Sequence, residues 1–158
     1  MSTYSYTRPK LLEMASDVEK GAAEFYMALS KKFPTHKEIF QKLAIDEEEH
    51  AKRYLDLLKS VGQMPDIYLT REDHMLAEQN LKVLETSGVI ANLKSAADHA
   101  KSIQDLLSAI QTAVQLERDS VVFYSGMAMA LSEKDRNEIY KIIEVEHRHL
   151  DKVQRISV

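Results

Sequence analysis

The chain has 158 residues, a formal net charge of −4 and no cysteine. Disulfides, thiolate nucleophiles and rubredoxin-type iron sites are therefore excluded within this sequence. The scattered Lys and Arg residues argue against nucleic acid or an anionic membrane as a partner. The chain starts without a signal-peptide profile and has no apolar run long enough to span a membrane, so we expect a cytoplasmic protein.

Apolar residues recur at three- and four-residue steps over four long stretches, which predicts four long helices. The sequence contains only four Gly and three Pro, which favours an all-α chain. The predicted helices span about residues 9–30, 35–61, 103–131 and 133–155. Thr7 and Ser132 are the expected N-caps of the first and the last, and Gly62 is expected to end the second.

The middle of the chain has a weaker pattern. Pro65 lies in a stretch that is typical of a loop, and a helix is expected over about residues 71–86, closed by Gly88. A further short helix is expected within residues 89–99.

The lengths of the connections predict the topology. The two short ones make each flanking helix pair an antiparallel hairpin, and the long middle segment can cross the whole bundle. We therefore predict a single domain over residues 1–158, an antiparallel four-helix bundle of two hairpins with one long crossover. The hairpins cover residues 9–62 and 103–155, and the crossover covers residues 63–102.

The two hairpins carry the same pattern of polar residues. In each, a Glu is followed by Phe-Tyr at the sixth and seventh positions, and a Glu-x-x-His follows on the next helix at nearly the same distance. One Glu-x-x-His in a Glu-rich helical protein would most simply be a solvated helix face, but the duplication disfavours that interpretation. The repeated residues are Glu19, Phe25, Tyr26, Glu47 and His50 in the first hairpin, and Glu117, Phe123, Tyr124, Glu144 and His147 in the second.

This spacing predicts a metal site in the bundle core. Residues three apart lie on one face of a helix, so each Glu-x-x-His can direct both side chains to one point. Two such pairs and one Glu from each remaining helix are the di-iron carboxylate pattern. Four carboxylates in a dry core need cations, and two divalent ions neutralise them. The predicted ligands are Glu19, Glu47, His50, Glu117, Glu144 and His147.

The remaining polar residues are assigned more ordinary places. Glu146 and Asp119 fall outside the predicted ligand stripe, and His149 lacks partners at ligand spacing. All three are therefore expected on the surface. Tyr26 and Tyr124 are either core aromatics or hydrogen-bond donors to ligand carboxylates. The mixed carboxylate and imidazole ligands suit two iron ions, and manganese or zinc is compatible with them.

At these residues the chain resembles the ferritin-like superfamily, nearest its rubrerythrin (erythrin) branch. The resemblance covers both hairpins and implies a non-haem di-iron oxidoreductase, in which hydrogen peroxide or dioxygen oxidises the ferrous pair. It also implies a homodimer. Rubrerythrins commonly carry a cysteine-ligated rubredoxin domain, so an external electron donor is expected here. They also have a further Glu where this chain has Ser120. The six-ligand set is in this respect closer to bacterioferritin, although no fifth helix is predicted.

Three functions are compatible with the sequence. The first is the oxidoreductase, which reduces peroxide or dioxygen with electrons from ferrous iron. The second is an iron-binding or iron-handling protein without catalytic turnover, which would use the same residues. The third is a structural bundle with a vestigial site, whose stability would not respond to added metal.

Overall fold

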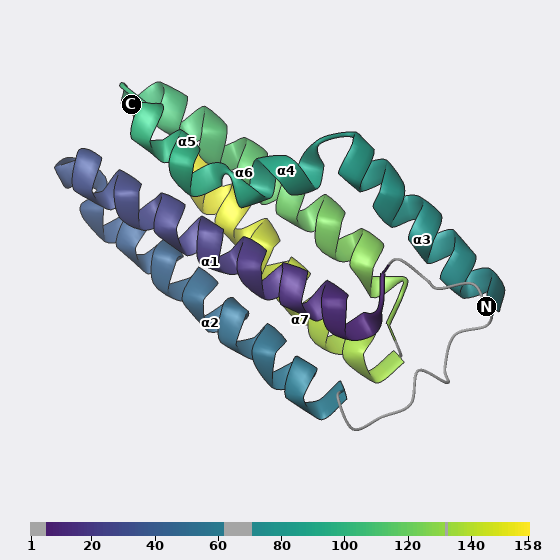
Figure 1. Ribbon diagram of the computed structural model, residues 1–158. Helices are drawn as coiled ribbons and strands as arrows, with labels where there is room; N and C mark the ends of the chain where they lie inside the picture. Colours follow the sequence, from purple (N-terminus) through teal and green to yellow (C-terminus); the bar gives the residue numbers. More distant parts are fainter. Residues whose placement is uncertain (1–5, 62–70, 132) are drawn as a thin grey trace.

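The computed structural model describes residues 6–61, 71–131 and 133–158. Its long helices form a bundle of two hairpins, as the sequence predicts, and three shorter helices make up the described part of the crossover (Figure 1). The long helices are α1 (Arg8–Lys32), α2 (Lys37–Val61), α6 (Leu106–Ala128) and α7 (Glu133–Gln154), and the shorter ones are α3 (Arg71–Thr86), α4 (Val89–Lys94) and α5 (Ala96–Ser102).

The first hairpin begins and turns where the sequence indicates. The backbone N–H of Lys10 donates to Thr7 Oγ1 at 3.3 Å, which caps α1 as predicted. Phe33 ends α1, and a 3₁₀ turn over Pro34–His36 leads directly into α2. So short a connection makes α1 and α2 antiparallel neighbours.

The crossover returns the chain to the end of the bundle at which α2 begins, so α2 and α6 run in the same direction (Figure 1). α3 packs along α6, and Gly88 follows it in the left-handed conformation, with φ of +83°, as its predicted place after a helix requires. α4 and α5 then pack against α1, and α4 also packs against α6. The predicted boundary residues Gly62, Pro65 and Ser132 lie outside the described residues.

α6 begins three residues later than the sequence predicts. Asp105 is its N-cap, and the Asp105 carboxylate accepts hydrogen bonds from the backbone N–H and the hydroxyl of Ser108, each at 2.8 Å. Ile103 is extended and ends α5 instead. The apolar pattern of the sequence begins at Ile103, two residues before the cap Asp105, and so predicts too early a start.

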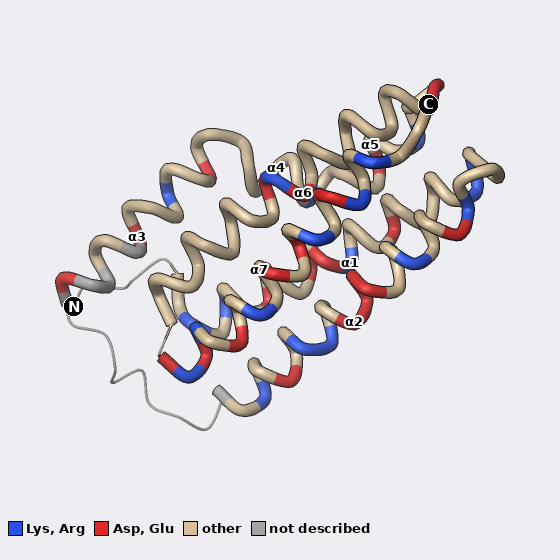
Figure 2. The backbone as a smooth tube through the Cα atoms, turned by 180° about the vertical axis from the view of Figure 1, so that it is seen from behind, with Lys and Arg blue, Asp and Glu red and all other residues tan. Residues whose placement is uncertain are grey.

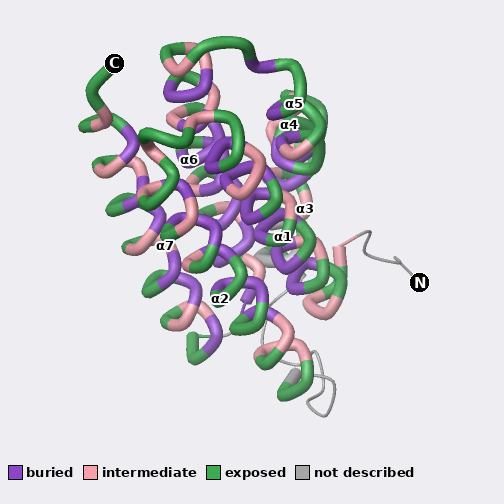
Figure 3. Tube along the Cα trace, turned by 90° about the vertical axis from the view of Figure 1, so that its left-hand side faces the viewer, coloured by how far each residue is buried: buried purple, intermediate pink, exposed green. Residues whose placement is uncertain are grey.

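The core lies between the four long helices, whose inward faces are buried and whose outward faces are exposed (Figure 3). Lys and Arg are spread along the helices and do not gather on one face (Figure 2). No described helix is both long enough and apolar enough to cross a bilayer. The polar residues of interest are therefore those few that the bundle encloses.

Candidate metal centre

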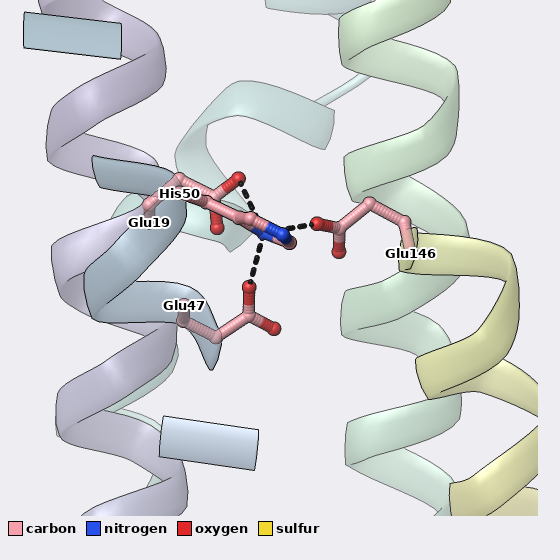
Figure 4. A group of neighbouring side chains, drawn as sticks. All are labelled: Glu19, Glu47, His50 and Glu146. Carbon is pink, nitrogen blue, oxygen red and sulfur yellow. Dashed lines mark hydrogen bonds and ion pairs between the residues drawn. The ribbon is translucent and has the colours of Figure 1, made fainter. Parts of the chain in front are cut away.

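Four of the six predicted ligands meet in the middle of the bundle. Glu19 comes from α1, Glu47 and His50 from α2, and Glu117 from α6. Each is at most 3% exposed. Glu19, Glu47 and His50 point toward one another from neighbouring helices (Figure 4). The fold thus brings together these residues from the two hairpins, which are far apart in the sequence.

The other two predicted ligands, Glu144 and His147, do not reach this cluster. Both lie on the exposed face of α7. The Glu144 side chain is 73% exposed and lies 3.7 Å from Arg148 in a surface ion pair. The prediction of these two residues as ligands is therefore wrong, because it selects the solvent-facing side of α7.

Glu146 and His149 take their places. Glu146 is 1% exposed and His149 is fully buried, although the sequence predicted both on the surface. The segment from Glu144 to His149 contains two overlapping Glu-x-x-His motifs, and only the second faces the core. The buried apolar residues of α7 identify the correct one, because Ile139, Ile142 and Val153 share a helix face with Glu146 and His149.

Three carboxylates surround the imidazole of His50 on its Nδ1 side. Nδ1 lies 2.8 Å from Glu146 Oε1, 3.1 Å from Glu47 Oε2 and 3.6 Å from Glu19 Oε1 (Figure 4). Burial alone would lower the pKa of His50, but these carboxylates outweigh it and raise that pKa to about 12. The site therefore favours a positive charge at this nitrogen.

His149 mirrors this arrangement. Its Nδ1 lies 3.1 Å from Glu47 Oε1, 3.8 Å from Glu146 Oε2 and 3.9 Å from Glu117 Oε2. The two imidazole rings are 5.7 Å apart between centroids. Glu47 and Glu146 thus each direct one carboxylate oxygen toward each histidine. Glu19 lies beside His50, and Glu117 lies beside His149.

Burial and mutual repulsion raise the pKa of all four carboxyls. Burial is the main cause for each, followed by the charge of a neighbouring Glu. The pKa of Glu19 rises to about 8, that of Glu47 to about 7 and that of Glu146 to about 8. The pKa of Glu117 is raised well above its ordinary value. The buried carboxyls therefore tend to keep their protons unless a positive charge lies beside them, and this suits the cluster to cations.

The residues fit a pair of divalent metal ions. They form two overlapping groups whose potential ligand atoms lie within 4.8 Å of one another, and Glu47 and Glu146 belong to both groups. Glu19 Oε1 and Glu117 Oε2 are buried without a hydrogen bond from any described residue, which leaves them free to bind a cation. Four carboxylates neutralise two divalent ions, and carboxylate with imidazole suits iron or manganese and tolerates zinc.

Asp46 contacts the nitrogen of His149 that faces away from the carboxylate cluster. Its Oδ2 lies 3.2 Å from His149 Nε2, and Lys152 Nζ lies 3.7 Å from the same oxygen. When Nε2 carries the proton and donates to Asp46, Nδ1 is left with its lone pair directed into the carboxylate cluster. Asp46 is absent from the sequence prediction, although it precedes His50 by four residues and so lies near the same face of α2.

Removal of Asp46 is expected to weaken metal binding without removing a ligand. Asp46→Ala should lower the affinity for the ion beside His149 by roughly 10–100-fold, because the imidazole loses the partner that fixes its orientation. The measurement is competition with a chelator of known affinity. Asp56→Ala removes an exposed acid from the same helix and serves as the control, and equal affinities of the two variants would contradict the role given to Asp46.

Three tyrosines border the carboxylates. The Tyr26 hydroxyl donates a hydrogen bond to Glu117 Oε1. Tyr124 is fully buried, and its ring packs against that of Tyr54 at 5.3 Å between centroids. Burial, together with the nearby carboxylates, holds the pKa of all three well above the ordinary value, so they keep their protons. Tyr54, one turn beyond His50, is absent from the sequence prediction.

Comparison with known proteins agrees with this geometry. A family model described as Rubrerythrin matches residues 10–157, which is nearly the whole chain. Neither the search of curated proteins nor the search of solved structures gives a match. The family match covers all six residues of the buried cluster and both hairpins. On this basis the chain belongs to the rubrerythrin family.

Proposed function

We propose that this protein is a non-haem di-iron oxidoreductase that reduces hydrogen peroxide or dioxygen. The observation that carries the proposal is the pair of overlapping Glu and His groups, in which Glu47 and Glu146 face both histidines. Carboxylates shared between two ions favour a paired site that can deliver two electrons. The metal must change its oxidation state during the reaction, which excludes zinc, and iron is the metal of this proposal.

Each of the six residues has a place in the proposed site. Glu19 and His50 would hold one ion, Glu117 and His149 the other, and Glu47 and Glu146 would serve both. Reduction of one peroxide molecule to two water molecules takes up two electrons and two protons. A ferrous pair supplies the electrons when it is bound.

The surrounding residues would control protons and water. The Tyr26 hydroxyl holds Glu117 in place, and the buried hydroxyls of Tyr54 and Tyr124 retain protons beside the carboxylates. The cluster residues are themselves buried within the apolar core, which keeps them from solvent. This environment strengthens electrostatic interactions between the carboxylates and a bound cation.

The electrons for repeated turnover must come from outside these 158 residues. The chain has no cysteine and so cannot bind rubredoxin-type iron itself. An external redox protein or a small reductant would return the ferric pair to the ferrous state. This requirement separates an oxidoreductase from an iron-handling protein, which would react once and stop.

The test is anaerobic loading with ferrous iron followed by rapid mixing with stoichiometric hydrogen peroxide or with dioxygen. We expect fast oxidation of two ferrous ions per chain by at least one oxidant, and repeated turnover once a reductant is added. A Glu47→Ala variant should not react, whereas Glu144→Ala should react as the unmodified protein does. Inertness of the loaded protein to both oxidants would refute the proposal, and oxidation without turnover would favour iron handling.

A further inference from the structure

A cavity lined mainly by residues with polar side chains lies on the side of α6 away from the metal centre, between that helix and the α4–α5 segment. Its volume is about 380 Å³, within the range of sites for small molecules. The α4–α5 segment contributes Asn92 and His99 to its walls, and α6 contributes Gln111, Thr112, Gln115 and Asp119. The lining residues include no Lys or Arg.

Asp119 is the buried polar residue of this cavity. It is only 7% exposed, although the sequence predicted it on the surface. Gln115 Nε2 donates to Asp119 Oδ1 at 2.8 Å, and the Asn92 amide also stabilises the carboxylate. None of the ion pairs between described residues involves Asp119. Its negative charge is therefore solvated by neutral amides and not neutralised by a basic side chain.

The cavity is separate from the metal centre. Asp119 follows Glu117 by two residues, a rotation of about 200° around the helix, so the two carboxylates face opposite sides of α6. Asp119 belongs to neither of the two groups that could hold a metal ion. A single carboxylate among amides and hydroxyls is a poor site for a metal ion but a good acceptor for N–H donors.

We propose that this cavity binds a small organic cation, with an ammonium or guanidinium group donating to the Asp119 carboxylate. A buried carboxylate is costly without a counter-charge, and a cation that enters the cavity offsets that cost. The amides of Gln111 and Gln115 and the hydroxyl of Thr112 can accept hydrogen bonds from further N–H groups of the ligand. A ligand in this position would contact both α6 and the α4–α5 segment.

The test is calorimetric titration of the metal-loaded protein with 1,4-diaminobutane and with agmatine, with butane-1,4-diol as a neutral probe of similar length. We expect both cations to bind and the diol to bind at least about tenfold more weakly. Hydrogen exchange should slow in α4, α5 and the first half of α6 when a cation is bound. Equal binding of the diol, or no binding of either cation at millimolar concentration, would overturn the proposal.

Two variants locate the site. Asp119→Asn should weaken binding of the cations by at least about tenfold. Asp98→Asn makes the same change of charge on exposed α5 and should leave the affinity unchanged. If Asp119→Asn fails to fold, Thr112→Leu, which narrows the cavity without a change of charge, should also weaken binding. Retained affinity in Asp119→Asn, or equal losses in Asp119→Asn and Asp98→Asn, would show that the cations bind elsewhere.

Discussion

Replacement of Glu146 or His149 by alanine is expected to abolish tight binding of the metal pair, whereas Glu144→Ala and His147→Ala should leave the metal content unchanged. Glu146 faces both histidines and belongs to both ligand groups. Its loss should therefore weaken binding by more than the roughly 10–100-fold that loss of a ligand's hydrogen-bond partner costs. Metal analysis of protein purified without chelators, with iron affinity measured for each variant, gives the result.

The two pairs of variants control for each other. They remove the same residue types from the same turns of α7, so a general loss of helix stability would affect both pairs. Circular dichroism should show that all four variants retain their helical structure. Loss of metal from Glu144→Ala or His147→Ala with retention in Glu146→Ala would show that the sequence-based register is correct and the structural one is not.

Without metal, the folded protein is expected to lose stability as the pH rises from about 4.5 to about 8. An ordinary Glu titrates near 4.5, whereas the pKa values of Glu19 and Glu146 are about 8 and that of Glu47 is about 7. Between these values the folded state holds protons that the unfolded state has lost. The free energy of unfolding therefore falls as the pH rises through this window.

Metal ions should reverse this loss, because they take the place of the protons and bind only to deprotonated ligands. Ferrous iron, manganese or zinc is expected to raise the melting temperature by on the order of 10 °C at pH 8 and by much less at pH 5. Thermal unfolding across this pH range, with and without metal, is the measurement. The combination Glu47→Gln/Glu146→Gln should remove the response to metal and only part of the pH dependence, because Glu19 and Glu117 remain buried. A melting temperature insensitive to metal in the unmodified protein would indicate a vestigial site.

The sequence predicts the helices and their topology well because these depend on local signals. Apolar spacing places the long helices, Thr7 and Gly88 mark helix ends, and the lengths of the connections determine the hairpins and the crossover. The start of α6 differs because Asp105, a strong N-cap, stands inside an apolar pattern that begins at Ile103. Ile103 is the C-cap of α5 and has an extended backbone, so α6 begins only after its own cap, Asp105.

The ligands on α7 show where local pattern is insufficient. Overlapping Glu-x-x-His motifs satisfy the same spacing rule, and a two-residue shift turns the side chains by about 200° to the other face of the helix. The choice depends on which face the rest of the bundle covers. Ile139 and Ile142 are buried on the face of Glu146 and His149. This apolar stripe indicates the correct motif, whereas the similar spacing of the motifs in the two hairpins does not distinguish it from the wrong one.

Asp46 and Asp119 could not be assigned from local pattern because their partners come from other helices. Asp46 on α2 meets His149 on α7. Asp119 is buried because α4 packs over its face of α6. A helix in isolation would present both acids to solvent.

The most direct test of the di-metal centre is anomalous diffraction from crystals of the iron-loaded protein. Two iron peaks are expected about 3.5–4 Å apart, both between Glu47 and Glu146, with His50 beside one and His149 beside the other. A single peak, or iron beside Glu144 and His147 on the outer face of α7, would contradict the account.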